Sequence, residues 1–399
     1  MRILFITTLN LATNPRLVKE IRLALDCGFN VDVVCFEFKN WSYANNLKII
    51  KDLKQVNFKI IPANRKPILP WLKSVVLEKM LKAYAGLFEI NGFYLSQAAS
   101  RRTVLLLNSI KSLENKYDWV IGHNYGAMYP AAFAAQKFNC KSGFDMEDYH
   151  PGEGHNVKEQ QLIKKLILEQ LPKFNYVSFA SPLIKEQVKV DFGKELSGWI
   201  ILLNYFTKNE FIKPNPLHNE VLNLVWFSQN INYGRGLEQI IPAIETKYPR
   251  IKLTLIGNKH EDFFNKYIQG KKSVTTLPPM EQSELHKALN NFDAGLAIEP
   301  GKDQNNLLAI GNKLLAYCQA GLFIIATDTP AHVNFFADKP GIAKITSLNK
   351  ENIKETIEEL LKKSECIQLS KQQRFTNFEL HCWETESVKL KEVWEDVVL

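Results

Sequence analysis

Short apolar runs alternate with segments of helical periodicity along both halves of the chain. Residues 3–7 form an apolar run that is typical of a buried strand. Residues 17–26 then place apolar side chains on one helical face, and Gly28 follows where a helix is expected to end. Residues 31–36 form the next apolar run. This order predicts a βαβ unit, and therefore a parallel sheet with helices on both faces.

The alternation continues to residue 205 and starts again after a polar segment, residues 206–220, which suits a linker. We predict the other strands of the first half at residues 58–61, 119–122, 141–145, 176–180 and 199–203. We predict the strands of the second half at residues 222–228, 252–257, 273–277, 294–298 and 323–326. Since 399 residues exceed one ordinary core, the predicted fold class is α/β, with two doubly wound Rossmann-like domains, residues 1–205 and 206–374, that face a cleft. The last stretch, residues 371–398, has a helical pattern.

The net charge of +8 is concentrated in one region, where 13 Lys and Arg stand against 4 Asp and Glu between Lys48 and Lys116. Within it, residues 66–116 interleave apolar residues such as Trp71 and Met80 with lysines. Such a segment is either a solvated helix whose apolar side packs on its own domain, or a surface that contacts an anionic membrane. Nucleic acid is not an expected partner, because no recognised binding module accompanies the charge.

Composition narrows the class of protein further. The six cysteines lack metal-ligand spacing, so we expect free thiols and no metal site. The N-terminus has the pattern of a first strand and not of a signal peptide. No apolar run reaches the ~18–20 residues that a spanning helix requires. We therefore expect a cytoplasmic protein, with peripheral attachment to the inner face of the cell membrane as the alternative that the basic region leaves open.

Candidate anion-binding residues occur at strand ends in the second half. Gly311, Asn312, Lys313 and Leu314 begin an apolar helix, and a helix N-terminus with its unpaired N–H groups can hold a phosphate. The alternative is a capped helix with a solvated lysine.

A second loop of this kind follows Ser228, which ends the first predicted strand of the second half. It contains Asn230 and leads through Arg235, between two glycines, into a helix. An arginine can grip a phosphate with its fork of donors. The alternative is a glycine-rich turn with an exposed arginine. Gly257 marks a third strand end, whose signal is weaker.

In the first half, His123 follows one predicted strand, and Asp145 and Glu147 follow the next. A histidine and carboxylates at adjacent strand ends can act on a hydroxyl group or position it. They could equally be a core histidine and first-turn acids of a helix. Asn14 and Arg16 begin the first helix, and we expect Arg16 to face the ligand cleft; a surface ion pair is the alternative.

The segments "NPRLVKEIRLALDCGFNVDVV", "DWVIGHN", "FDMEDYH", "LLNYF", "GRGLEQIIPAI" and "NKLLAYCQAGLFIIATD", in this order, resemble the retaining GT-B glycosyltransferases of the family-four type, which build bacterial polysaccharides and glycoconjugates. The last segment is the strongest match. The resemblance covers nearly the whole chain. It implies the GT-B fold, with the C-terminal helix, residues 375–399, crossing back onto the first domain.

The resemblance also implies an activity, namely transfer of a sugar from a UDP- or GDP-linked donor to a glycan or lipid-linked acceptor. The donor diphosphate would lie near Arg235 and residues 311–314, with the base against Leu277. The first domain would bind the acceptor, with His123 near the transferred sugar. Such enzymes generally need neither a bound metal nor a cofactor, because basic groups and a helix dipole stabilise the departing diphosphate.

Two positions depart from the family pattern. The paired glutamates around the donor helix are replaced by Leu308 and Ala316, so a ribose-binding carboxylate is missing unless Glu299 substitutes. A second cation, expected five residues before Arg235, is replaced by Asn230, and Lys313 could supply that charge. Two alternatives therefore stay open: a nucleotide-sugar epimerase of the same fold, and a non-catalytic binding protein that has lost its donor residues.

Overall fold

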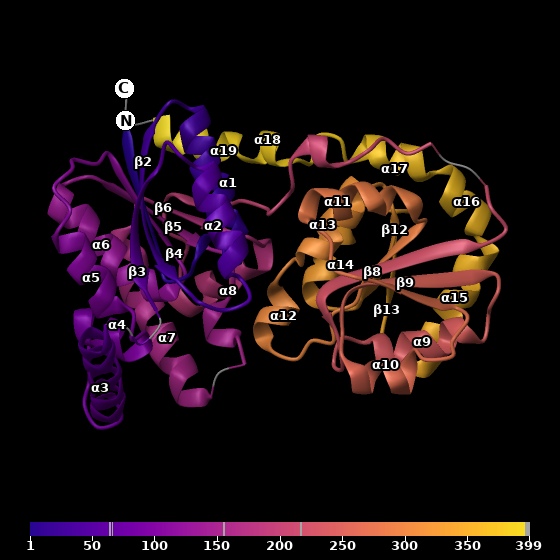
Figure 1. Ribbon diagram of the computed structural model, residues 1–399, viewed down its shortest axis with the longest axis horizontal. Coiled ribbons are helices and arrows are strands. Elements are labelled where there is room, and N and C mark those ends of the chain that lie inside the picture. The colour runs from indigo at the N-terminus through magenta and orange to yellow at the C-terminus, as the bar shows by residue number, and fades with distance from the viewer. Residues whose placement is uncertain (64, 66, 155, 216–217, 396–399) are drawn as a thin grey trace. The chain divides into compact units, whose positions relative to one another are not determined.

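The structure is a computed structural model that describes residues 1–63, 65, 67–154, 156–215 and 218–395. It divides into two compact units (Figure 1). Met1–Leu202 and Lys389–Leu399 form the N-terminal unit, and Leu203–Val388 form the C-terminal unit. Lys66 of the basic region, two residues of the predicted linker and the last four residues of the predicted C-terminal helix lie outside the described residues.

The N-terminal unit is built on a seven-stranded sheet of order β3-β2-β1-β4-β5-β6-β7, and every strand pair in it is parallel. Its strands are β1 (Arg2–Thr7), β2 (Asn30–Glu37), β3 (Asn57–Pro62), β4 (Trp119–His123), β5 (Lys141–Met146), β6 (Tyr176–Phe179) and β7 (Trp199–Ile201). Its helices are α1 (Pro15–Asp26), α2 (Tyr43–Asp52), α3 (Ile68–Ala85), α4 (Gly92–Ala99), α5 (Thr103–Lys111), α6 (Met128–Phe138), α7 (Val157–Gln170), α8 (Pro182–Phe192) and α19 (Val388–Glu395). The strand order reverses between β1 and β4, which is the switch point of this sheet.

Local sequence explains how the first βαβ unit forms. The apolar residues of β1 are fully buried, as the run of residues 3–6 predicts. Asn14 caps α1 by accepting a hydrogen bond from the Leu17 amide, and Pro15 occupies the first helical turn, where its missing N–H costs nothing. Gly28 follows the helix with φ of 76°, a conformation that favours glycine.

The end of the chain completes the core of the N-terminal unit. Trp394 on α19 is fully buried, and its indole N–H donates to the Tyr176 hydroxyl at 3.2 Å. The Trp119 indole donates in turn to the Trp394 carbonyl at 3.3 Å. Two strands and the final helix are thereby tied together across more than two hundred residues of sequence.

The C-terminal unit contains a six-stranded parallel sheet of order β10-β9-β8-β11-β12-β13, with its switch point between β8 and β11. Its strands are β8 (Leu222–Ile231), β9 (Ile251–Lys259), β10 (Val274–Leu277), β11 (Ala294–Ala297), β12 (Phe323–Thr327) and β13 (Ala343–Thr346). Its helices are α9 (Leu237–Glu245), α10 (Glu261–Tyr267), α11 (Gln282–Ala288), α12 (Gln304–Leu308), α13 (Asn312–Gln319), α14 (Pro330–Phe336), α15 (Lys350–Lys362), α16 (Ser364–Leu369), α17 (Lys371–Asn377) and α18 (Trp383–Glu386). The predicted class, two doubly wound α/β domains, is confirmed.

Two details differ from the sequence-based expectation. The helical stretch predicted at residues 371–398 is three helices, α17, α18 and α19. It is interrupted because Cys382 is extended and the Trp383 amide donates to the Phe206 carbonyl at 3.0 Å, a bond that a continuous helix could not make. The edge strand β13 was not predicted, since its four residues are too few and too mixed in polarity to form an apolar run.

Candidate functional site

The two switch points are the natural places to look for ligands. In a doubly wound sheet, ligands bind outside the carboxyl ends of the strands, where the strand order reverses. In the N-terminal unit these ends belong to β1 and β4, and in the C-terminal unit to β8 and β11.

A pocket of about 430 Å³ lies at the carboxyl ends of β1, β4 and β5 in the N-terminal unit. Four carboxylates, two guanidinium groups and a histidine contribute to its wall. The lining residues are Thr8, Leu9, Thr13, Glu78, Ala99, Ser100, Arg101, Arg102, Asn124, Tyr125, Glu147, Asp148, His150 and Glu153. The hydroxyl groups and charges suit a polar, hydroxyl-rich ligand, and the carboxylates can accept hydrogen bonds from it.

Glu147 is the one predicted catalytic residue that lines this pocket. Burial raises the pKa of its carboxyl group to about 7, and the neighbouring negative charges of Asp148 and Asp145 add to the shift. A carboxyl group that titrates near neutral pH can take or return a proton under physiological conditions, as general acid–base chemistry requires.

Two residues of the pocket that are outside the predicted catalytic set carry unusual features. Asn124 has φ of 68° and ψ of 144°, a strained conformation for a residue with a side chain, and its Oδ1 accepts a hydrogen bond from Thr7 Oγ1 at 2.8 Å. His150 is buried, with Nδ1 2.8 Å from a carboxylate oxygen of Glu153 and with Nε2 lacking a hydrogen-bond partner in the described part of the chain. Asn124 directly follows β4 and His150 lies four residues after the end of β5, and this position was the available signal.

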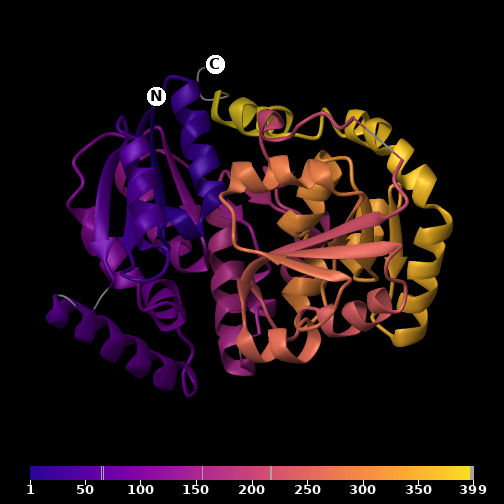
Figure 2. The same ribbon diagram turned by 45° about the vertical axis from the view of Figure 1, so that its right-hand side comes forward.

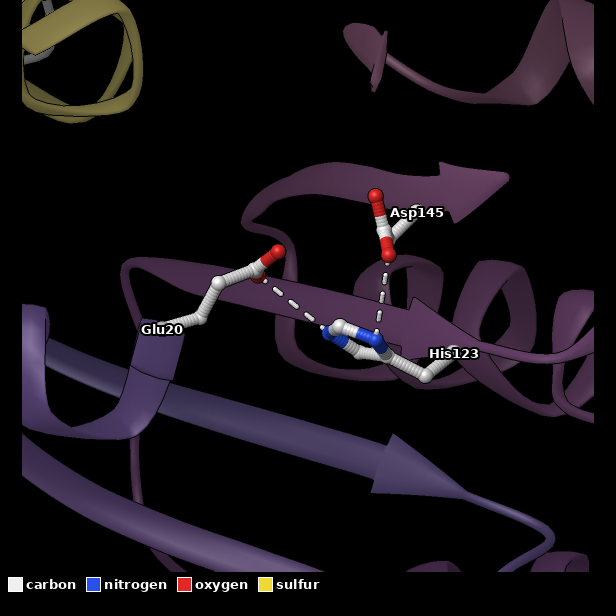
Figure 3. Close-up of side chains that lie close together, drawn as sticks. All are labelled: Glu20, His123 and Asp145. Atoms are coloured by element: carbon white, nitrogen blue, oxygen red, sulfur yellow. Dashed lines mark hydrogen bonds and ion pairs between the residues drawn. The ribbon is translucent and has the colours of Figure 1, made fainter. Parts of the chain in front are cut away.

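A buried ion-pair cluster lies beside the pocket and uses the other predicted catalytic residues (Figure 3). One ring nitrogen of His123, Nε2, lies 3.2 Å from a carboxylate oxygen of Glu20, and Nδ1 lies 3.5 Å from Asp145. Arg16 Nε donates to Asp145 at 2.6 Å. Ser178 donates to the second oxygen of Asp145, also at 2.6 Å. The residues Arg16, Glu20, His123 and Asp145 are at most 1% exposed.

Electrostatics in the cluster favour charged forms in spite of the burial. Burial alone would lower the pKa of His123, but the Glu20 and Asp145 carboxylates outweigh it and raise that pKa. Burial alone would likewise raise the pKa of Asp145, and the Arg16 guanidinium and His123 hold it below its usual value. An imidazolium with two N–H donors between two carboxylates, beside a guanidinium, gives two positive and two negative charges.

The acceptor-side prediction for Arg16 requires correction. The side chain is fully buried; besides Asp145, it donates to the Leu202 carbonyl at 2.8 Å. Asn14 is fully buried as the cap of α1. Neither residue lines the pocket, because the polar groups that the sequence places at the start of α1 satisfy buried partners of the same unit. His123 and Asp145 are held in the same way, so of the predicted catalytic residues only Glu147 reaches the pocket wall.

The cluster has the composition of a small metal site, since Glu20, His123 and Asp145 could each offer one ligand atom within 4.8 Å of the others. The geometry favours ion pairs instead. Both ring nitrogens of His123 already face carboxylates, and the Arg16 charge lies 2.6 Å from the oxygen that a cation would need. We therefore interpret the cluster as structural.

In the C-terminal unit, the loop after β8 brings cations to the switch point. Arg235 is exposed and lies between Gly234 and Gly236, both of which have positive φ. Lys302, in the loop after β11, lies so close to Gly234 that a Cβ atom there would be 2.6 Å from its Nζ. No described residue forms an ion pair with Arg235 or Lys302. Lys302 was not predicted, because only the folded sheet brings the two loops together.

A carboxylate partly occupies the same loop. The Gly234 amide donates to Glu238, in the first turn of α9. The other carboxylate oxygen, Oε2, is buried without a hydrogen-bond partner among the described residues. An amide that could bind a phosphate is therefore satisfied by the chain itself, as is typical of a first-turn glutamate.

Glu299 and Lys313 lie together at the start of α13. They are the residues that could replace the missing ribose-binding carboxylate and the missing second cation. Their charged atoms lie 3.3 Å apart, and Lys313 Nζ is 5.8 Å from the ring centroid of Trp226 on β8. Gly311 precedes the helix, and no side chain caps it. Asn312 Oδ1 accepts a hydrogen bond from Asn204 at 2.9 Å. The first turn of α13 thus presents an uncapped amide end beside an ion pair.

Two other predicted donor residues, Leu314 and Gly257, have structural roles. Leu314 is buried in the core, and its amide donates to the Gly311 carbonyl, so its prediction as a ligand contact is corrected. A Cβ atom on Gly257 would lie 2.3 Å from the Ser228 carbonyl oxygen, which explains the glycine at this close approach of β9 to β8. Asn230 is exposed near the end of β8, and Leu277 is the last residue of β10.

Comparison with solved structures identifies the fold. A glycosyltransferase from Rickettsia africae matches with a TM-score of 0.66 at 12% identity, covering 100% of this chain and 98% of that chain. Sucrose-phosphate synthase from Thermosynechococcus elongatus matches with 0.66 at 11% identity, covering 100% and 99%. HepE from Anabaena, solved in complex with UDP and glucose, matches with 0.66 at 12% identity, covering 99% and 100%. No protein-family model matches the sequence, and no curated relative matches it either.

At these identities the similarity establishes the fold. It extends over the full length of the chain and of each compared chain, so it includes both sheets. The predicted GT-B fold is confirmed.

Proposed function

We propose that this chain, which has the GT-B fold of the glycosyltransferases that it resembles, moves a sugar from a nucleotide-sugar donor to a glycan or a lipid-linked acceptor. The observation that carries the proposal is the pair of cations, Arg235 and Lys302, in the glycine-rich loops at the switch point of the C-terminal unit. HepE, which shares the fold, was solved with UDP-glucose, and this supports a UDP-linked donor; a GDP-linked donor is the alternative.

In this proposal the donor diphosphate binds at the carboxyl edge of the second sheet. Arg235, Lys302 and Lys313 supply three positive charges, and Glu238 and Glu299 supply two negative ones. A diphosphate would neutralise the positive charges of Arg235 and Lys302, which form no ion pair with a described carboxylate. Glu299, held beside Lys313, would take the ribose hydroxyls in place of the carboxylate that is missing at Ala316.

The reaction exchanges one bond at the anomeric carbon for another. The bond to the diphosphate oxygen breaks, and its electron pair leaves with the nucleoside diphosphate. The acceptor oxygen forms the new bond, and its proton passes to a base. Guanidinium, ammonium and helix N–H groups stabilise the charge that develops on the leaving group, without a metal. By resemblance the proposed stereochemistry is retention.

The acceptor is proposed to bind in the pocket of the N-terminal unit. Glu147 faces this pocket with a pKa of about 7 and can accept the hydroxyl proton or orient the hydroxyl group. The carboxylates of Asp148 and Glu153 offer further acceptors for sugar hydroxyls. His123 and Asp145 would be positioning residues, because the buried cluster to which they belong holds the strand ends beside the pocket in place.

A second candidate is a GT-B protein that binds sugars without transferring them. Glu238 supports it, because its carboxylate holds a loop amide that a phosphate would use. Ala316 supports it as well, because it is fully buried where the family pattern has an acid.

Calorimetry tests the donor site. UDP-glucose and GDP-sugars are titrated into the wild type, Arg235→Ala and the control Arg250→Ala, which removes an exposed arginine at the amino end of β9. We expect micromolar to millimolar binding by the wild type, at least tenfold weaker binding by Arg235→Ala, and no change in the control. Equal affinities in all three proteins would overturn the site. Binding without release of nucleoside diphosphate, with or without an acceptor mixture, would favour the second candidate.

A further inference from the structure

The helix α3 exposes a continuous apolar line along one side. It stands at the edge of the N-terminal unit in both ribbon views (Figures 1 and 2). Five large apolar residues recur along it at intervals of three or four, so they share one helical face. This outward face of α3 consists of Leu69, Leu72, Val76, Met80 and Tyr84, which are between 46% and 75% exposed.

The opposite side of α3 packs on the N-terminal unit, so this unit does not cover the outward face. Ser74 is buried and donates to the Trp71 carbonyl at 2.7 Å. Leu81 packs against an apolar cluster that includes Ile90 and Leu95. The half of the helix that can pack on α4 does so, and the apolar line lies on the other half.

The outward face carries positive charge without a carboxylate. Lys73 and Lys79 are exposed between its apolar residues, and no described residue forms an ion pair with either. The acidic residue of α3, Glu78, binds Lys82 at 3.2 Å on the inward side, and Lys82 also binds Glu159 at 3.0 Å. An apolar strip flanked by unpaired lysines is complementary to an anionic surface with an apolar interior.

Aromatic and apolar residues extend the strip beyond the C-terminal end of α3. Tyr84 and Phe88 stack with their ring centroids 4.6 Å apart, and Leu87 is 80% exposed. At the other end, the Arg65 guanidinium lies 5.4 Å from the ring centroid of Trp71. Rings with one apolar and one polar side are enriched at the boundary between lipid and water.

We propose that the outward face of α3 docks this protein on an anionic lipid bilayer. The helix would lie in the plane of the headgroups, since no helix in the described part of the chain is long and apolar enough to cross a membrane. A second copy of the chain fits this face less well. Packing two such faces together by a two-fold axis would bring Lys73 and Lys79 of both copies into one interface without a carboxylate.

The inward side of the same helix connects the docking surface to the acceptor pocket, because Glu78 lines that pocket. A lipid-linked acceptor in the bilayer would then present its headgroup close to Glu147. The position of such an acceptor rests on the proposed function, whereas the docking itself does not.

Vesicle flotation tests the docking without any nucleotide sugar. The full chain is mixed at low salt with vesicles of phosphatidylcholine alone or with phosphatidylglycerol added. We expect binding only to the anionic vesicles and a steep decrease with salt. The double variant Lys73→Gln/Lys79→Gln should bind about thirtyfold more weakly, from about 1 kcal/mol per lysine. Its control, Lys272→Gln/Lys354→Gln, removes the same charge from exposed positions of the C-terminal unit.

The apolar part of the face has its own variant. Leu69→Ser/Met80→Ser should lose binding to anionic vesicles while keeping the melting temperature of the wild type, because both side chains are more than half exposed. Leu380→Ser, at an equally exposed leucine of the C-terminal unit, should bind like the wild type. Absence of wild-type binding to anionic vesicles, or equal losses in the controls, would overturn docking. A dimer in solution that Leu69→Ser/Met80→Ser dissociates, without vesicle binding, would assign the face to a second copy. Donor affinity, measured separately, decides the proposed function.

Discussion

The two sheets share one topology but equip their switch points with different chemistry. In the N-terminal unit polar and charged residues, Thr7, His123 and Asp145, lie at or next to the last positions of their strands, and the pocket above them is rich in carboxylates. In the C-terminal unit the short central strand β11 is apolar to its end, and the loops beyond the strands carry Arg235 and Lys302. The same topology therefore carries a carboxylate-rich pocket in one unit and a glycine-rich loop with cations in the other. Topology decides where a ligand lies, and the side chains decide which ligand it is.

The backbone at the two switch points differs as well. The C-terminal unit places glycines with positive φ in its loop, Gly234 at 67° and Gly236 at 78°. The N-terminal unit holds an asparagine with a comparable φ, Asn124, on the other side of its switch point, directly after β4. The glycines of the C-terminal loop adopt these angles without strain, whereas Asn124 is strained and has to be held in place by the residues around it.

Breaking the buried cluster should have the largest effect. Asp145→Ala leaves the Arg16 guanidinium and His123 without their common carboxylate, so we expect the free energy of unfolding to fall by about 3–5 kcal/mol. Urea denaturation followed by circular dichroism measures it. The control Glu89→Ala removes an exposed ion pair with Lys165 and should change little. Equal losses in both variants would contradict the distinction between buried and exposed pairs.

The positive and negative charges at the switch point of the C-terminal unit should change donor affinity in opposite directions. Lys302→Ala removes a cation beside Gly234 and should weaken binding of the nucleoside diphosphate about tenfold. Glu238→Gln removes a negative charge from the same loop and should strengthen binding severalfold. Isothermal titration with UDP and GDP measures both. A decrease in affinity for Glu238→Gln would show that its carboxylate supports the loop more than it repels the phosphate.

The pKa of Glu147 should make stability depend on pH. The pKa is about 7 in the folded protein, above the value of ~4.3 in an unfolded chain. The folded state therefore holds the proton more tightly, and stability from the neutral carboxyl group is present below pH ~4.3 and lost as the pH rises to about 7. The melting temperature of the wild type relative to Glu147→Gln should fall over this window and level off above pH 7. A difference in melting temperature that does not change with pH would contradict the raised pKa of Glu147.

The smallest effect is expected at the strained asparagine. Asn124→Gly removes a side chain that is disfavoured at this positive φ, and the relief of strain should offset the lost bond from Thr7, leaving stability within about 1 kcal/mol of the wild type. Asn124→Ala loses the bond and keeps the strain, so it should be less stable than Asn124→Gly by about 1–2 kcal/mol. Urea denaturation separates them. Greater stability of the alanine variant would show that the conformation at Asn124 is not strained.

Much of the fold was predictable from local pattern. The runs of apolar residues predicted twelve of the thirteen strands that the described residues form, because strands buried on both faces read as apolar runs. The edge strand β13 and the division of the C-terminal stretch into three helices were not predictable, since a half-buried edge and a tertiary hydrogen bond leave no period in the sequence.

The sequence by itself also determined which polar residues follow strand ends, and hence that Glu147, Arg235, Glu299 and Lys313 would gather at the carboxyl edges of the sheets. Only the tertiary structure decided their partners. Arg16 and Asp145 are 129 residues apart and form a buried pair, which withdraws both from the pocket. Lys302 meets Gly234 only when β8 and β11 are neighbours. Helix α3 is apolar nearly all round, so its sequence could not say which side would remain uncovered. Periodicity is a property of neighbours along the chain, whereas partners and exposure depend on which distant segments pack together.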